Sequence, residues 1–206
     1  MRIIFIDNSV NFTSSSLILK ALDSLQKILI NFSSELSRKN HEVIFYNKTE
    51  NEKIEEGVSW KNIDNLEYDY ADILIVVQQI ELFEYKIKAK IKFLLLHYKT
   101  NDYFNKDSLV QILKEKICFL YTNNYVVNSL PDNFRFVPKL HLKIGVDRSF
   151  IENKNNSFNY SNVFVTTHPL KGMDWLIDLW LKYVNIKLPW AELHIYSKLL
   201  DSNAKI

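Results

Sequence analysis

The chain has 206 residues, of which 47% are hydrophobic and 14% aromatic, so it is long and apolar enough to bury a substantial core. This composition excludes a disordered or fibrous protein, and the formal net charge of +2 is too small to predict nucleic acid as a partner. A single cysteine, Cys118, permits no disulfide within the chain and indicates a reducing compartment. The N-terminus has the pattern of a strand and not of a signal peptide, and no apolar run is long enough to span a bilayer, so we expect a cytoplasmic protein.

The first 46 residues have the pattern of a βαβ unit. Residues 2–7 form an apolar run typical of a buried parallel strand, and residues 8–16 are polar. Apolar residues then recur at helical spacing from Leu17 to Leu36, which predicts one helix that ends near residues 38–40. A second strand is predicted at 41–46, and the hydroxyl side chains at 14–16 are interpreted as helix caps.

The next hundred residues alternate between apolar runs and helical patterns. Polar residues 47–65 predict a loop with short elements. After this loop we predict strands at 72–77, 92–96 and 117–122, and helices at 81–90, 107–116 and 126–130. This alternation predicts an α/β protein with a Rossmann-like parallel sheet, and it argues against an antiparallel sandwich.

Lysines alternate with apolar residues between positions 86 and 92. We interpret this run as a solvated face, and contact with anionic lipid at the inner membrane face is the alternative.

His97 directly follows the apolar run 92–96, which places an imidazole at the carboxyl end of a parallel strand. Open α/β sheets bind their ligands at that edge. A single histidine at such a position can also be purely structural. Asp102, a few residues further on, is a weaker candidate for the same site.

A second βαβ pattern lies near the C-terminus, between Asn162 and Lys198. Residues 162–166 and 191–196 predict two parallel strands, and residues 173–184 between them have helical spacing. Asp178 and Lys182 are spaced for a weak ion pair on the polar face of this helix.

Lys171 and Gly172 stand just before this helix. The first N–H groups of a helix attract an anion, a glycine lets a phosphate approach the backbone, and a lysine adds a full charge. Taken alone, the dipeptide is equally compatible with a solvated loop lysine and an ordinary turn glycine.

Several of these segments together resemble the family 4 retaining glycosyltransferases of the GT-B fold. The second domain of that family begins with a strand, a loop containing (R/K)G-(L/M/V)-D, a helix and a strand of the type AELHIYG, which read NVFVTTHP, LKGMD and AELHIYS here. In the first domain, NHEVIFYN is similar to the family's GHEV segment, and KIGVDRSF is similar to its PNGVD segment with a nearby Phe. The family has a basic residue five positions before the lysine, where this chain has Thr166.

The resemblance implies a retaining, metal-independent transferase of polysaccharide biosynthesis, without a cofactor. It would transfer a sugar from a nucleotide-sugar donor to a surface-glycan or lipid-linked acceptor. By the same resemblance, His97 is the catalytic-site residue that orients the donor sugar, and Asn8 and Ser9 belong to the acceptor-side loop. Donor binding falls to Lys171, Gly172 and Thr166. Residues 1–150 would form the acceptor-side domain, and residues 151–206 the start of the nucleotide-sugar domain.

The Glu-rich motif with which the family holds the donor's ribose and sugar does not occur in this sequence. We therefore expect a truncated second domain, whether the chain is a fragment, an interrupted reading frame or a reduced protein. The alternative function is a non-catalytic remnant that binds a glycan or a partner. An incomplete domain would expose apolar surface around Trp175, Trp180 and Trp190 and favour self-association.

Overall fold

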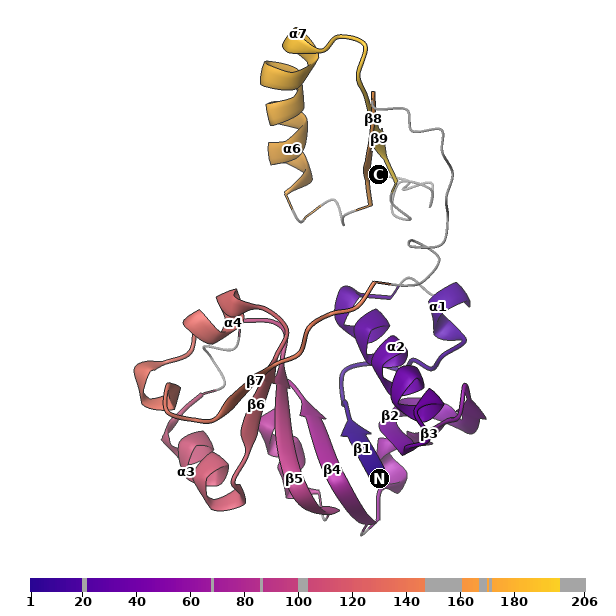
Figure 1. The fold of residues 1–206 in the computed structure, drawn as a ribbon, viewed down its shortest axis with the longest axis vertical. Helices are drawn as coiled ribbons and strands as arrows, with labels where there is room; N and C mark the ends of the chain where they lie inside the picture. Colours follow the sequence, from indigo (N-terminus) through magenta and orange to yellow (C-terminus); the bar gives the residue numbers. More distant parts are fainter. Residues whose placement is uncertain are drawn as a thin grey trace. The chain divides into compact units, whose positions relative to one another are not determined.

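The computed structural model describes residues 1–19, 22–67, 69–85, 87–99, 104–146, 161–166, 170 and 172–196. The chain divides into two compact units, Met1–Gly145 and Val146–Ile206, and each is described here by itself (Figure 1). Within the described ranges, no helix combines the length and the apolar character needed to cross a membrane.

The first unit is built on one seven-stranded sheet with the order β3-β2-β1-β4-β5-β6-β7 (Figure 1). Its strands are β1 (Arg2–Ile6), β2 (Glu42–Glu55), β3 (Val58–Asn62), β4 (Asp69–Val77), β5 (Ile87–Leu96), β6 (Cys118–Tyr121) and β7 (Lys139–His141). The α-helices are α1 (Ser16–Leu19), α2 (Ser24–Arg38), α3 (Lys106–Glu115) and α4 (Asn124–Asn128), and the 3-10 turns are η1 (Ile63–Asn65), η2 (Ile80–Glu84) and η3 (Asp132–Phe134). The predicted α/β class with a Rossmann-like parallel sheet is confirmed.

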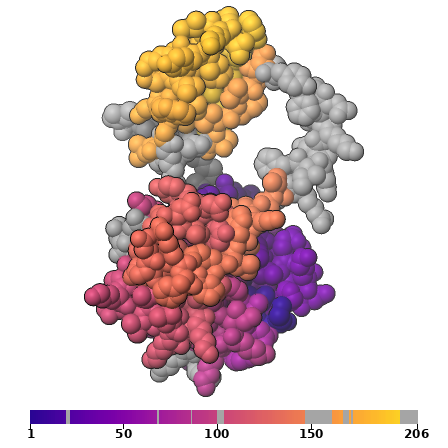
Figure 2. Space-filling model, turned by 60° about the vertical axis from the view of Figure 1, so that its left-hand side comes forward, coloured from indigo at the N-terminus to yellow at the C-terminus, as the bar shows by residue number. Residues whose placement is uncertain are grey.

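Alternate residues of the strands point to opposite faces of the sheet, and each face has its own core. On β1, Ile3 and Phe5 face one core, while Ile4 and Ile6 face the other. Helix α2 covers the first face with Leu25, Leu29 and Ile30. The second face is covered by η2, α3 and α4. In Figure 2, the chain from α3 to β7 forms a continuous surface. The unit is therefore a three-layer α/β/α sandwich.

An aromatic ladder of Phe5, Phe45 and Trp60 crosses β1, β2 and β3 on the α2 face. The three residues share one register, with Phe5 opposite Phe45 and Phe45 opposite Trp60. The rings stack with centroids 5.2 and 4.8 Å apart, and all three side chains are fully buried. Phe12, from the loop after β1, packs edge-on against Phe45 and Trp60 at 5.3 and 5.8 Å. The ladder thus fixes the strand register and also anchors this loop.

Three expectations about local structure were wrong. The helix predicted from residue 17 onward is divided, because Asp23 starts a new helix with a capping box that includes Gln26. The predicted loop at 47–65 is mostly strand. The predicted helix at 81–90 is the short η2 followed by the first residues of β5.

Strand β2 folds back on β3. Its first part pairs in parallel, with Val43 opposite Val58, whereas its last part runs the other way, with Lys53 opposite Trp60. A two-residue turn connects the end of β2 to the start of β3, and its residues Glu56 and Gly57 have φ values of 49° and 75°. Two positive φ values are the signature of a type I′ hairpin turn.

The second unit contains the parallel pair β8 (Asn162–Val165) and β9 (Glu192–Ile195), joined through α6 (Met173–Leu179). The helix continues through a π turn at Trp180–Val184 into α7 (Asn185–Lys187). The predicted βαβ pattern and the Asp178–Lys182 ion pair, at 2.7 Å, are confirmed. Trp175 and Trp190 are 68% and 66% exposed, as expected, whereas Trp180 is half-buried.

Gly57→Ala should destabilise the first unit by about 1–2 kcal/mol, because an L-residue at positive φ meets its own backbone. A Cβ at this position would also lie 2.2 Å from Ser37 Oγ. The matched control is Gly145→Ala, where no atom lies within 4 Å of the added Cβ and the free energy of unfolding should change by less than about 0.5 kcal/mol. Urea denaturation measures both. Adding Ser37→Ala to Gly57→Ala should restore only part of the loss, and equal stability of the two single variants would contradict the assignment of this turn.

Candidate functional site

The sheet changes direction at β1. From there the chain order proceeds through β2 to β3 on one side and through β4 to β5 on the other. Ligands of open α/β sheets bind at such a switch point, beyond the carboxyl ends of the strands. Because Ile6 of β1 lies opposite Val76 of β4, Asp7 and Gln78 follow at neighbouring strand ends. This edge of the first unit is the candidate site.

The loop after β1 is tied down by β2. Asn47 donates from Nδ2 to the carbonyl of Phe12 at 2.6 Å. Further along, the Ser15 N–H donates to Glu55 Oε2 at 3.0 Å, and Lys53 Nζ donates to Ser15 Oγ at 3.1 Å. The folded-back part of β2 therefore supports the loop that carries Asn8 and Ser9.

Asp7 is buried at the start of this loop, with 2% of its surface exposed. Its Oδ1 accepts a hydrogen bond from the Ser9 N–H at 2.9 Å, while Oδ2 has no partner among the described residues. Burial raises the pKa of the Asp7 carboxyl above its usual value, against the hydrogen bonding of Ser9 and the attraction of Lys48. Asn8 is half-buried and Ser9 is exposed.

His97 lies half-buried directly after β5, and its ring connects three elements. Its Nδ1 is 2.7 Å from Thr122 Oγ1, at the end of β6, and its Nε2 is 3.2 Å from Ser24 Oγ, at the start of α2. Its carbonyl accepts from Asn123 Nδ2 at 3.3 Å. Both ring nitrogens thus have protein partners, and the histidine positions neighbouring elements whatever its role toward a ligand.

The start of α2 already holds a carboxylate. Asp23 caps the helix and accepts from the Ser24 N–H at 2.6 Å. The Tyr98 hydroxyl donates to the same carboxylate. Burial and this contact with Asp23 raise the pKa of Tyr98 to about 12, so the phenol stays protonated at neutral pH. A phosphate at this helix start would meet a negative charge.

Gln78, at the end of β4, has a φ of 62°, which is uncommon for a residue other than glycine. With its amide oriented to meet both donors, its oxygen accepts from the N–H groups of His97 and Tyr98 at 2.7 Å each. Gln78 therefore holds the backbone of His97 and Tyr98 in place.

The remaining predicted residues belong to the second unit. Thr166 is exposed just after β8, and Gly172 is exposed with a φ of 87° as the N-cap of α6. Among the described residues, apart from its chain neighbours, no atom lies within 4 Å of a Cβ built at Gly172. Lys171 and Asp102 lie outside the described residues.

The start of α6 differs from those of the other main helices. Side chains of Asp23, Asn105 and Asn123 cap α2, α3 and α4. At α6, Gly172 supplies no side-chain hydrogen bond. Among the N-cap residues of these four helices, only Gly172 offers the first N–H groups no side-chain acceptor.

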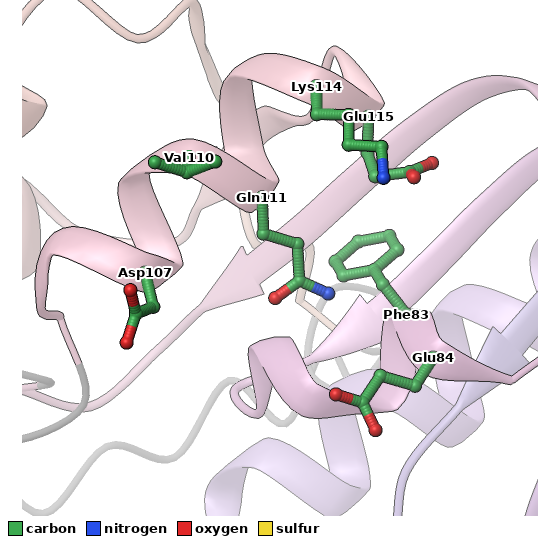
Figure 3. A pocket seen from close by; sticks show the side chains of 7 residues that line it. All are labelled: Phe83, Glu84, Asp107, Val110, Gln111, Lys114 and Glu115. Atoms are coloured by element: carbon green, nitrogen blue, oxygen red, sulfur yellow. The ribbon is translucent and has the colours of Figure 1, made fainter.

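A separate hollow of about 480 Å³ lies between η2 and α3 (Figure 3). It is lined by Phe83, Glu84, Asp107, Val110, Gln111, Lys114 and Glu115. Acidic and basic groups are mixed along its rim, and none of the predicted site residues lines it. We do not assign a ligand to it.

No protein-family model matches this chain, and a search of curated proteins returns no match. The class is therefore defined by the structure: an α/β protein with a Rossmann-like, seven-stranded parallel sheet. Sequence reasoning found His97, Asn8 and Ser9 at the carboxyl edge but missed Asp7, Gln78, Asp23 and Thr122. An acidic residue directly after an apolar strand was the available signal for Asp7.

Asp7→Asn should stabilise the fold near neutral pH, by roughly 1 kcal/mol, because it replaces a buried charge with a neutral amide. The pKa of Asp7 is raised in the folded state, so the protonated carboxyl favours folding. This contribution to the free energy of unfolding is complete below the unfolded pKa of about 3.9 and is lost as the pH rises through the folded pKa. The advantage of the asparagine variant should therefore grow over that interval. Urea denaturation at a series of pH values measures it.

Glu55→Gln is the control of opposite sign. Burial alone would raise the pKa of Glu55, but hydrogen bonds from Lys53 and from the Ser15 N–H outweigh it and lower the pKa to about 2. The wild-type advantage over this variant should thus be present at neutral pH and disappear as the pH falls through about 2. A wild-type protein more stable than Asp7→Asn at pH 7 would refute the assignment of Asp7.

Proposed function

We propose that this chain belongs to a glycosyltransferase of the GT-B type that transfers a sugar from a nucleotide-sugar to a glycan or lipid-linked acceptor. The observation that carries the proposal is the agreement between the resembling motifs and the geometry of the second unit. The LKGMD motif contains Gly172, which is the N-cap of α6. The AELHIY motif contains β9, which pairs in parallel with β8.

The geometry of Gly172 supports a diphosphate at this position. A φ of 87° turns the chain sharply into the helix. Gly172 itself offers the N–H groups of the first turn no side-chain acceptor, and a helix start of this kind can hold an anion. In the proposed mechanism these groups and Lys171 neutralise the charge that develops on the departing diphosphate.

The first unit supplies the acceptor side in this proposal. Its parallel sheet has a switch point at β1, where the carboxyl edge collects Asp7, Gln78 and His97. His97 joins β5, β6 and α2 through its ring, and the proposal assigns it the positioning of the groups that face the sugar.

Lys171→Ala should weaken the binding of a nucleoside diphosphate, with UDP, GDP and ADP as probes in titration calorimetry. Removal of one donor to a developing oxyanion typically costs about 2.7–4 kcal/mol in the transition state, which sets an upper bound on the loss in ground-state binding. Lys182→Ala is the matched control. Lys182 lies in the π turn between α6 and α7, and its Nζ forms an ion pair with Asp178 Oδ2 at 2.7 Å. Equal affinity of the two variants, or no binding of any probe by the wild type, would contradict the proposed donor site.

A non-catalytic binding module of the same origin is the second candidate. It is favoured by one observation: both ring nitrogens of His97 already have partners within the protein. Incubation with UDP-, GDP- and ADP-sugars together with methyl glycosides as acceptors separates the two, because a transferase passes the sugar to an acceptor hydroxyl and releases a nucleoside diphosphate that can be detected. Binding without any release identifies the module.

A further inference from the structure

The backbone of His97 is held on both sides of its Cα. With its amide oriented to meet both donors, Gln78 accepts from the His97 N–H at 2.7 Å, and the His97 carbonyl accepts from Asn123 Nδ2 at 3.3 Å. Gln78 makes its contact from a backbone with a φ of 62°, which is strained for a residue other than glycine. Such strain persists where the surroundings hold it in place, and it gathers at functional sites. The position of His97 is therefore closely determined.

A buried hydroxyl orients the imidazole ring. His97 Nδ1 lies 2.7 Å from Thr122 Oγ1, and Thr122 is buried at the end of β6. The same hydroxyl oxygen accepts from Asn123 Nδ2 at 3.4 Å. When this oxygen also accepts from Nδ1–H, the lone pair of the neutral imidazole stays on Nε2, because only one ring nitrogen carries a proton. In that tautomer Nε2 can accept a proton from a neighbouring group.

The neighbouring group at Nε2 is the hydroxyl of an exposed serine. Ser24 is the first residue of α2, and its Oγ lies 3.2 Å from His97 Nε2. Ser24, His97 and Thr122 come from three separate elements and stand in the order hydroxyl, base and orienting group. Proteins activate a serine in this way: the base takes the hydroxyl proton while a third group holds the base in place.

The Asp23 carboxylate lies beside this pair. Its Oδ1 accepts from the Ser24 N–H at 2.6 Å and lies 3.3 Å from Ser24 Oγ, so the hydroxyl has two acceptors within reach. An imidazole is a stronger base than a carboxylate by about two pH units, so proton transfer goes to Nε2. The negative charge of Asp23 then favours the imidazolium that forms. Because Asp23 holds the Ser24 N–H, that group does not stabilise an oxyanion, and we expect slow turnover.

We propose that Ser24 is a nucleophile activated by His97 and that it takes an acyl group from an ester. Ser24 Oγ forms a bond to the carbonyl carbon of the ester, and its proton passes to His97 Nε2. The bond from that carbon to the alkoxy oxygen breaks, and the proton leaves with the alcohol. Water then releases the acyl group as a carboxylic acid and restores the serine. This activity needs no nucleotide and is independent of the proposed sugar transfer.

The full chain is incubated with p-nitrophenyl acetate, the release of p-nitrophenolate is followed, and the acetylated residue is located by mass spectrometry of peptides. We expect the wild type to release p-nitrophenolate faster than Ser24→Ala and to carry an acetyl group on Ser24. His97→Gln keeps a polar side chain without the base, and it should lower the Ser24-dependent rate at least about 100-fold, the lower end of what a general base contributes. Equal rates in the wild type and Ser24→Ala, with acetyl groups on lysines alone, overturn the inference.

Thr122 provides a matched pair of variants for the orienting group. Thr122→Ser keeps the hydroxyl beside Nδ1 and should retain most of the Ser24-dependent rate, whereas Thr122→Val has the same shape without the hydroxyl and should lose most of it. Equal rates in these two variants overturn the role of Thr122. Ser24→Ala changes only an exposed side chain, so its comparison with the wild type stays decisive even where a variant at position 97 or 122 unfolds.

UDP, GDP and ADP are titrated into the wild type and Ser24→Ala to separate this inference from the proposed transferase. Nucleotide binding without Ser24-dependent release of p-nitrophenolate supports the transferase and rejects the nucleophile. Ser24-dependent release without nucleotide binding supports the nucleophile and rejects the transferase.

Discussion

The first unit depends on the aromatic ladder of Phe5, Phe45 and Trp60. Three large rings in one register can stack only when β1, β2 and β3 pair as observed, so a slip of any strand would separate the rings and turn apolar residues away from their core. Phe12 closes the end of this stack. Phe12, from the loop after β1, is therefore held by the same rings that set the sheet register. The core thus determines where the loop of the candidate site lies.

The polar groups at the carboxyl edge form a second layer on this scaffold. Gln78 holds two backbone N–H groups, His97 joins β6 to α2, and Asp23 caps α2 while receiving the Tyr98 hydroxyl. Nearly every donor and acceptor in this network is satisfied, which gives the edge a defined shape. Asp7 Oδ2 is the exception, because it has no hydrogen-bond partner among the described residues, unlike the other polar groups at this edge.

The sequence indicated those elements whose pattern is local. Buried strands such as β1 and β4, and the β8–α6–β9 unit, were found because their apolar runs and turn residues are contiguous. The break before α2 could have been recognised from Asp23 and Gln26, three residues apart as a capping box requires. The hairpin of β2 and β3 was missed because its returning part is polar and exposed and therefore resembles a loop.

The composition of the site was harder to predict than its location. Asp7, Gln78, His97 and Thr122 come from four different strand ends, and only the sheet order brings those ends to neighbouring positions. No spacing in the sequence encodes that order. The charge of the edge also depends on which helix start is already capped, which is a property of side-chain geometry and not of residue type alone.

The open edge of β5 has a consequence for the behaviour of the protein in a crowded solution. Strand β6 pairs only with Phe93–Leu96 of β5, so in the described part of the unit the earlier residues of β5 have no strand on that side. An open strand edge is a template for pairing with another chain. Lys88, Lys90 and Lys92 alternate along this edge, and Lys90 and Lys92 are held there by Asp72 and Glu115. Charged lysines on an open strand edge disfavour edge-to-edge aggregation, which gives a physical reason for this charge pattern.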